Sequence, residues 1–112
     1  MADKRQIYLF CEAGMSTSIM VKKMQKIADE HNLPVQIDAY PMAVAQEKVD
    51  ERKPIIIVLG PQVKFMMDKV KAQFEPQGIP VTSIDSSVYG SMNGEQALKN
   101  ILQDLRDSKK EN

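Results

Sequence analysis

Two runs of consecutive apolar residues constrain the fold of this chain more than any other feature. They cover residues 7–10 (IYLF) and residues 55–59 (IIIVL). Apolar side chains at consecutive positions are typical of strands that are covered on both faces, as in a parallel sheet. Each run ends at a break that contains glycine, and apolar residues at helical spacing follow the break. We therefore predict two central parallel strands, each leading into a helix.

Weaker strand patterns lie between and after these runs. Residues 35–39 alternate apolar and polar side chains, which indicates an edge strand, and residues 79–84 contain Pro80, which also favours an edge. Helical spacing links the four segments. The sequence therefore predicts an α/β fold with a doubly wound, four-stranded parallel sheet of order 2-1-3-4 and helices on both faces. We expect one domain over residues 1–106 and a frayed polar tail over residues 107–112.

Local signals set the connections. Pro34 ends the first helix, which is expected to begin at Ser16 as its cap, and residues 40–41 are expected to turn the chain. Residues 42–50 are predicted as a short helix and residues 85–92 as a loop. Asn93 and Gln96 have the spacing of a capping box before the last helix.

The break after the first strand is the candidate site. Cys11, the single cysteine of the chain, stands between the strand and a short loop with Gly14, before the helix start. Unpaired N–H groups and the helix dipole make such a start an anion site, and they favour a thiolate nucleophile. A free cysteine that ends a core strand is also a common buried hydrophobe, so the residues alone leave both roles open.

Composition excludes several other functions. Fifteen basic and fifteen acidic residues give a formal net charge of zero, so no attraction to nucleic acid follows from charge. No segment approaches the roughly 20 apolar residues of a membrane span, and the polar start does not fit a signal peptide. Motifs for phosphate-binding P-loops, dinucleotide sites and zinc sites are missing from the sequence, so we expect no cofactor and no metal.

Residues 9–18 (LFCEAGMSTS) resemble the active-site segment of the enzyme IIB components of the bacterial phosphoenolpyruvate-dependent sugar phosphotransferase system. The similarity is to the lactose, cellobiose and N,N'-diacetylchitobiose branch, and it extends from about residue 4 to residue 105. Residues 59–62 (LGPQ), 84–85 (ID) and 89–90 (YG) are similar to family segments in the same order.

The resemblance implies a cytoplasmic phosphocarrier. Cys11 would accept a phosphoryl group from a phosphohistidine of a IIA protein and pass it to a sugar, such as cellobiose, chitobiose or lactose, held by a membrane IIC protein. We also expect a monomer without membrane insertion, and the start methionine and short polar tail favour a freestanding chain. The expected phosphate-binding residues are those that follow the cysteine: Glu12, Ala13, Gly14, Met15, Ser16 and Thr17. Glu12 departs from the small residue that is frequent in relatives, and its carboxylate would repel phosphate unless it points to solvent.

The predicted strand order places a switch point between the first and third strands, where ligands bind in such sheets. Cys11 and Gly60 both lie at carboxyl ends there. A possible docking rim surrounds them, although the same residues can serve only to pack the rim. Its residues are Met15, Pro41, Pro61, Gln62 and Tyr89.

Two other functions remain open. Low-molecular-weight protein tyrosine phosphatases resemble this architecture, but their motif has an arginine six positions after the cysteine, where this chain has Thr17. Arginine stabilises the transferring phosphoryl group, so its replacement favours a carrier whose phosphocysteine hydrolyses slowly. The second is a non-enzymatic anion-binding or receiver-like module, although receivers have clustered acidic residues where Glu12 stands alone.

Overall fold

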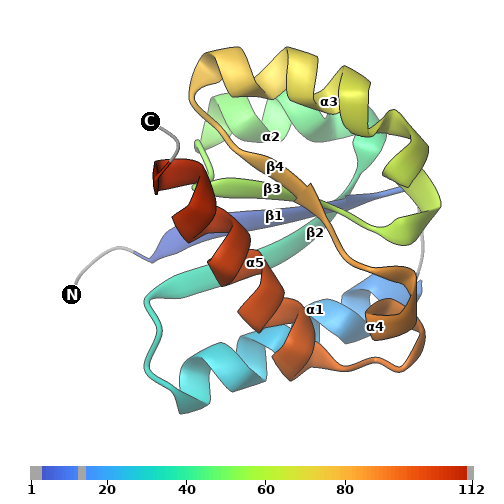
Figure 1. The fold of residues 1–112 in the computed structure, drawn as a ribbon, viewed down its shortest axis with the longest axis vertical. Coiled ribbons are helices and arrows are strands. Elements are labelled where there is room, and N and C mark those ends of the chain that lie inside the picture. Colours follow the sequence, from blue (N-terminus) through green and yellow to red (C-terminus); the bar gives the residue numbers. More distant parts are fainter. Residues whose placement is uncertain (1–3, 13–14, 111–112) are drawn as a thin grey trace.

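A computed structural model of the chain describes residues 4–12 and 15–110. Within these residues, four strands form one parallel sheet of order β2-β1-β3-β4, which confirms the predicted fold and strand order (Figure 1). The strands are β1 (Arg5–Cys11), β2 (Val35–Pro41), β3 (Ile56–Leu59) and β4 (Val81–Ser83).

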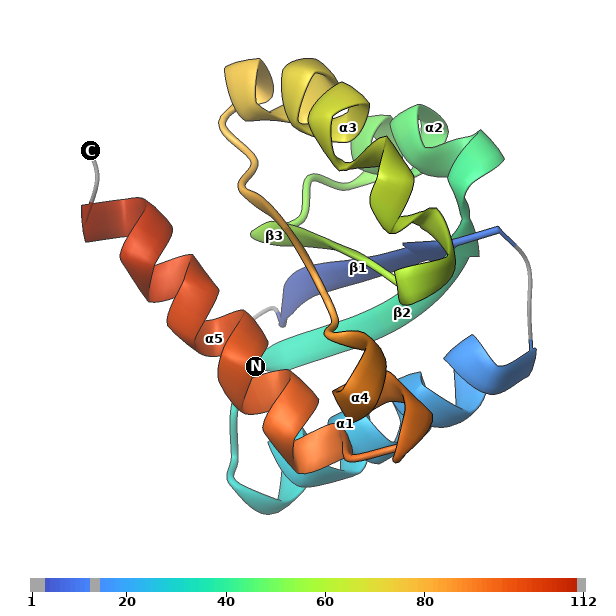
Figure 2. The same cartoon turned by 45° about the vertical axis from the view of Figure 1, so that its right-hand side comes forward.

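Helices cover both faces of the sheet. One face carries α2 and α3, and the other carries α1, α4 and α5, as the two views in Figure 1 and Figure 2 show. The α-helices are α1 (Met15–Glu30), α2 (Ala45–Glu51), α3 (Met67–Phe74), α4 (Ser86–Gly90) and α5 (Gly94–Lys110). Three short 3-10 helices join them: η1 (Met42–Val44), η2 (Pro61–Met66) and η3 (Glu75–Gln77).

The central strands explain why two layers of helices are needed. Alternate residues of β1 enter different cores: Ile7 and Leu9 pack with α1 and α5, whereas Tyr8 and Phe10 pack with α2 and α3. All four side chains are at most 3% exposed. A strand with no solvent face must be apolar at every position, which is the pattern that predicted these strands.

Three local predictions differ from the structure. β2 continues through Pro41, which pairs in register with Cys11, so residues 40–41 extend the strand and do not turn the chain. The predicted strand over residues 79–84 is shorter, because Pro80 has no N–H to pair and β4 covers only Val81–Ser83. Residues 85–92, predicted as a loop, contain α4, whose Tyr89 N–H bonds the Asp85 carbonyl at 2.9 Å. α5 extends as far as Lys110.

Local side-chain hydrogen bonds support both ends of α5. The Gln96 N–H donates to Asn93 Oδ1 at 3.0 Å, so the predicted cap forms, but the Gln96 side chain bonds Asn100 and does not complete the capping box. Near the other end, Gln103 donates to Asp107 at 3.0 Å. Such local pairs extend a helix whose apolar face is already packed, at little further cost.

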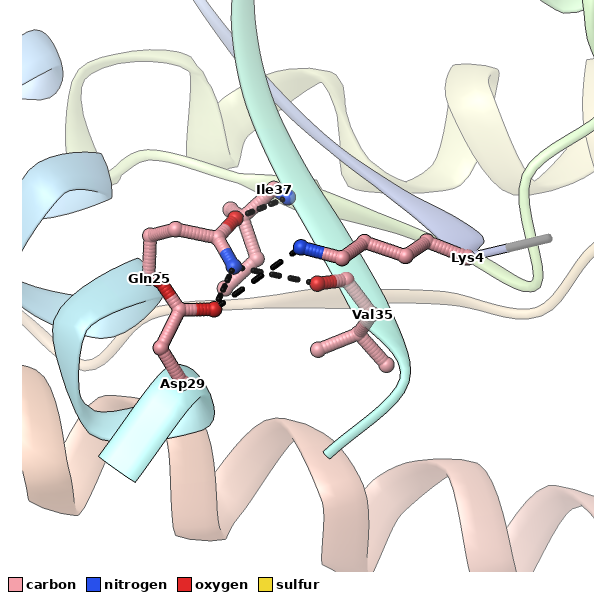
Figure 3. A network of polar contacts seen from close by, with 5 residues as sticks. All are labelled: Lys4, Gln25, Asp29, Val35 and Ile37. Atoms are coloured by element: carbon pink, nitrogen blue, oxygen red, sulfur yellow. Dashed lines mark hydrogen bonds and ion pairs between the residues drawn. The ribbon is translucent and has the colours of Figure 1, made fainter. Parts of the chain in front are cut away.

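Gln25 of α1 covers the outer edge of β2 (Figure 3). Its Oε1 accepts the Ile37 N–H at 2.8 Å, and its Nε2 donates to the Val35 carbonyl at 3.0 Å and to Asp29 at 3.0 Å. Lys4 reaches the same Asp29 at 3.9 Å. Backbone groups at a sheet edge otherwise invite pairing with another chain, so this side chain both fixes α1 and blunts the edge.

Candidate active site

Cys11 is the last residue of β1 and lies at the carboxyl edge of the sheet. Its neighbours are Pro41, its register partner at the end of β2, and the segment that follows β3. β1 leads into α1 on one face of the sheet, and β3 leads into η2 and α3 on the other. The predicted switch point is therefore present, with a free thiol that is 6% exposed beside it.

Gly60 makes room next to this thiol. Its N–H donates to the Phe10 carbonyl at 3.0 Å, which holds it against the end of β1. A Cβ atom at Gly60 would lie 3.8 Å from the Cys11 Cβ and 3.0 Å from Gln62 Oε1. The glycine thus allows the Gln62 amide oxygen and the end of β1 to approach its Cα closely, which a residue without a side chain permits.

The loop after Cys11 is short. Glu12 forms a bend with an exposed side chain, so its carboxylate can stay in solvent. Ala13 and Gly14, which the sequence proposed as phosphate contacts, lie outside the described residues, as do the side chains of Met15 and Ser16. α1 begins at Met15, so the prediction that Ser16 caps it is wrong: Ser16 is the second residue of the helix.

Thr17 and Tyr89 form a buried pair. Thr17 Oγ1 lies 3.0 Å from the Tyr89 hydroxyl, and their residues are 2% and 7% exposed. The Thr17 hydroxyl, proposed as a phosphate donor, therefore has a partner inside the protein. Tyr89 packs in the core with α1 and α5, so its burial favours the packing role over the docking role that we considered for it.

The other proposed rim residues remain accessible. Pro41 and Gln62 are exposed and Pro61 is half-buried. Phe65 of η2, for which no role is predicted above, is 83% exposed. It falls between the buried Val63 and the half-buried Met66.

A polar contact fixes the start of α4 near the same edge. The Ser87 hydroxyl donates to the Asp85 carboxylate. This hydrogen bond, with a smaller contribution from the Lys64 ammonium, holds the pKa of the Asp85 carboxyl below its ordinary value. Asp85 is fully exposed, so it is an ionised surface group and not a buried acid.

No group of three metal-ligating side chains occurs within the part of the chain that the structure describes. Over the same residues, no helix has the length and apolarity needed to cross a membrane.

The fold and the site define a class: small parallel α/β proteins with one cysteine at the end of the first strand, at the switch point of the sheet. A family described as the lactose/cellobiose-specific IIB subunit of the PTS system matches residues 6–100. The chain belongs to this family, whose members are phosphotransferase components of sugar transport systems.

Individual relatives agree with the family. The chain is 42% identical over 101 residues to the PTS galactose-specific EIIB component of Lactococcus lactis subsp. cremoris, covering 88% of this chain and 93% of that protein. It is 41% identical, with the same coverage, to the cellobiose-specific EIIB component of Lactococcus lactis subsp. lactis. The solution structure of the cellobiose-specific IIB component from Borrelia burgdorferi is similar, with a TM-score of 0.75, 32% identity and 96% of each chain covered.

Proposed function

We propose that this chain carries a phosphoryl group on Cys11 during sugar uptake. The Cys11 thiolate attacks the phosphorus of a phosphohistidine on a IIA protein, so that an S–P bond forms and the N–P bond breaks. A hydroxyl of the sugar held by a IIC protein then attacks the same phosphorus and gives its proton to a base of the IIC site or to water. The O–P bond forms, the S–P bond breaks, and the thiolate returns. The proposed sugar is a β-glucoside or a disaccharide such as cellobiose, chitobiose or lactose.

The observation that carries this proposal is the position of Cys11. It ends β1 at the switch point of the sheet, and only Glu12, Ala13 and Gly14 separate it from α1. Residues 15–18 include no acidic side chain, so the positive end of the helix dipole is not neutralised there. Such a position stabilises both a thiolate and the phosphate that it acquires.

The same site suits a carrier better than a hydrolase. The loop has no arginine to grip the phosphoryl group, and Thr17 at the position of the phosphatase arginine is bonded to Tyr89. Cys11 itself is almost fully covered. A phosphocysteine in this setting lacks an obvious group that would stabilise the transition state for attack by water, and it can persist until the acceptor arrives.

We further propose that protein partners approach over the accessible rim. Transfer requires the donor or acceptor atom to come within about 3–3.5 Å of the reacting centre, so either partner must contact the residues around Cys11. Pro41, Pro61 and Gln62 surround it, and Phe65 offers the largest exposed apolar side chain in the described structure. Phosphoryl donor and sugar acceptor both come from other proteins, which explains why this chain needs little beyond a nucleophile and a cradle.

Intact-protein mass spectrometry tests the proposal. Wild type and Cys11→Ser are incubated with phosphoenolpyruvate, the general phosphotransferase enzymes and a matching IIA protein. We expect wild type to gain one phosphoryl group, to lose it when sugar and IIC membranes are added, and Cys11→Ser to gain none. Thermal unfolding of both proteins shows that the variant is folded. A wild type that stays unmodified beside a donor of verified activity would contradict the proposal.

A further inference from the structure

The Thr17–Tyr89 pair lies where the chemistry proposed above needs a fixed backbone. Thr17 belongs to the first turn of α1, and Tyr89 belongs to α4, 72 residues away in sequence. The two hydroxyls meet at 3.0 Å inside the core that α1 shares with α5. Every fully buried side-chain nitrogen or oxygen within the described residues has a hydrogen-bond partner, and for these hydroxyls the pair supplies one.

A buried threonine hydroxyl in a helix has another option. It can bond to a carbonyl of the preceding turn, as Ser and Thr often do. At Thr17 the hydroxyl instead reaches across to a different element. A phenol is the more acidic of the two hydroxyls and the better donor, so we assign the shared proton to Tyr89 and the accepting lone pair to Thr17.

α4 is itself held in place against α1. Ser87 bonds Asp85 at the start of α4, and the Asn93 N–H bonds the Val88 carbonyl at 3.2 Å beyond its end. The α4–α5 corner, residues 91–93, leads directly to Gly94. A Cβ at Gly94 would lie 2.8 Å from the Lys23 Cβ and 3.0 Å from the Lys23 carbonyl carbon. The helices that flank this corner therefore touch α1 at two places, Gly94 on its second half and Tyr89 on its first turn.

We propose that Tyr89 is a positioning residue for phosphoryl transfer at Cys11. Through Thr17 it fixes the first turn of α1, whose free N–H groups would hold the phosphate oxygens. This inference rests on the proposed carrier function. Tyr89 touches neither donor nor acceptor; it sets the orientation of the cradle, because donors fixed in advance stabilise developing charge without having to reorganise.

The rate of phosphoryl transfer from phosphorylated IIA to Cys11 tests the inference. Tyr89→Phe keeps the ring and removes the hydroxyl, and Thr17→Val removes the other hydroxyl at nearly constant shape. We expect each variant to slow transfer by roughly two- to tenfold, the range that corresponds to one ordinary hydrogen bond. The double variant should slow transfer by less than the product of the two single effects, because both single variants remove the same contact. Thr17→Ser, which keeps the hydroxyl, should transfer at close to the wild-type rate.

Tyr8→Phe is the matched control. Tyr8 is also a buried tyrosine, 3% exposed, and its hydroxyl donates to the Arg52 carbonyl at 2.6 Å, on the face of the sheet that α1 does not cover. It should lower stability without slowing transfer. Equal slowing in Tyr8→Phe and Tyr89→Phe, or a wild-type rate in Tyr89→Phe, would overturn the inference. A wild-type protein that accepts no phosphoryl group from active donor would instead refute the carrier function itself.

Discussion

The two faces of the sheet hold their helices in different ways. On the face of α2 and α3, helices of 7 and 8 residues cover an aromatic cluster in which Tyr8 and Tyr40 meet edge to face at 5.4 Å. On the face of α1 and α5, helices of 16 and 17 residues are placed by individual contacts. These are the Gly94 approach to Lys23, the Gln25 bonds to the edge of β2, and the Thr17–Tyr89 pair.

This difference follows from what each face has to do. Apolar burial is non-directional, so the aromatic cluster by itself stabilises α2 and α3 without fixing them to a fraction of an ångström. Hydrogen bonds and backbone contacts are directional, and they suit a helix whose first turn must present N–H groups to a ligand. Both faces combine apolar burial with specific contacts, such as the hydrogen bond from Tyr8 to the Arg52 carbonyl beside α2. The specific contacts that place α1 lie on the face that carries the chemistry, and the other face contributes Gly60, Gln62 and the exposed Phe65 to the rim.

Among substitutions that test this difference between the faces, Gly94→Ala should lower stability most. The new Cβ would meet the Lys23 backbone, which cannot move aside as a side chain can. We expect α5 to shift from α1 and the free energy of unfolding to fall by about 1–3 kcal/mol, the usual cost of overpacking. Urea unfolding followed by circular dichroism measures the change.

Gly90→Ala is the control for that substitution. A Cβ at Gly90 has no heavy atom within 4 Å, so the added methyl group meets open space. Alanine also favours the helical conformation, so we expect stability to stay constant or to rise by up to about 1 kcal/mol. Equal losses of unfolding free energy in both variants would mean that the contact of Gly94 with α1 does not cause the loss.

Gln25→Ala should have a smaller effect. It removes the two hydrogen bonds to the β2 backbone, and Ile37 N–H and the Val35 carbonyl are left to water. We expect a loss of about 1 kcal/mol in the free energy of unfolding. The uncovered edge should also promote self-association at high concentration, which sedimentation velocity detects.

Gln46→Ala on the opposite face sharpens the contrast. Gln46 bonds only other side chains, Asp50 at 2.8 Å, Gln73 at 3.0 Å and Gln77 at 3.2 Å, and all of these contacts are exposed. Its loss should change stability by less than about 0.5 kcal/mol. If Gln46→Ala cost as much as Gln25→Ala, hydrogen bonds to the strand backbone would matter no more for stability than exposed hydrogen bonds between side chains.

The sequence predicted the parts of this fold that depend on hydrophobic periodicity. Strand order, the two-sided burial of β1 and β3 and the edge position of β2 all follow from which residues are apolar. Short elements were predicted less well. α4 has five residues and buries one side chain, Tyr89, so no periodic signal could reveal it.

Some residues of the candidate site could likewise be predicted from the sequence and others could not. The placement of Cys11 and Gly60 at neighbouring strand ends follows from strand order, which periodicity determines. The Thr17–Tyr89 pair depends on how α4 packs on α1, and nothing in the spacing of two hydroxyl residues so far apart predicts that they meet. Phe65 was missed because the sequence alone does not distinguish an exposed phenylalanine next to buried positions from a buried one.

The smallest effect concerns the start of α4. The Ser87 hydrogen bond lowers the Asp85 pKa in the folded protein, so its contribution to stability is present above the ordinary value of 3.8 and is lost as pH falls through the folded pKa. In Ser87→Ala the Asp85 pKa should rise toward 3.8, and stability should depend less on pH below that value. Carboxyl carbon NMR titration of Asp85 measures the shift.

Ser91→Ala is the control for Ser87→Ala: it loses a bond to the Val88 carbonyl and should leave the Asp85 pKa unchanged. Because this anchor is fully exposed, transfer to Cys11 should hardly change, and a large change would mean that α4 depends on Asp85 more than on the packing of Tyr89.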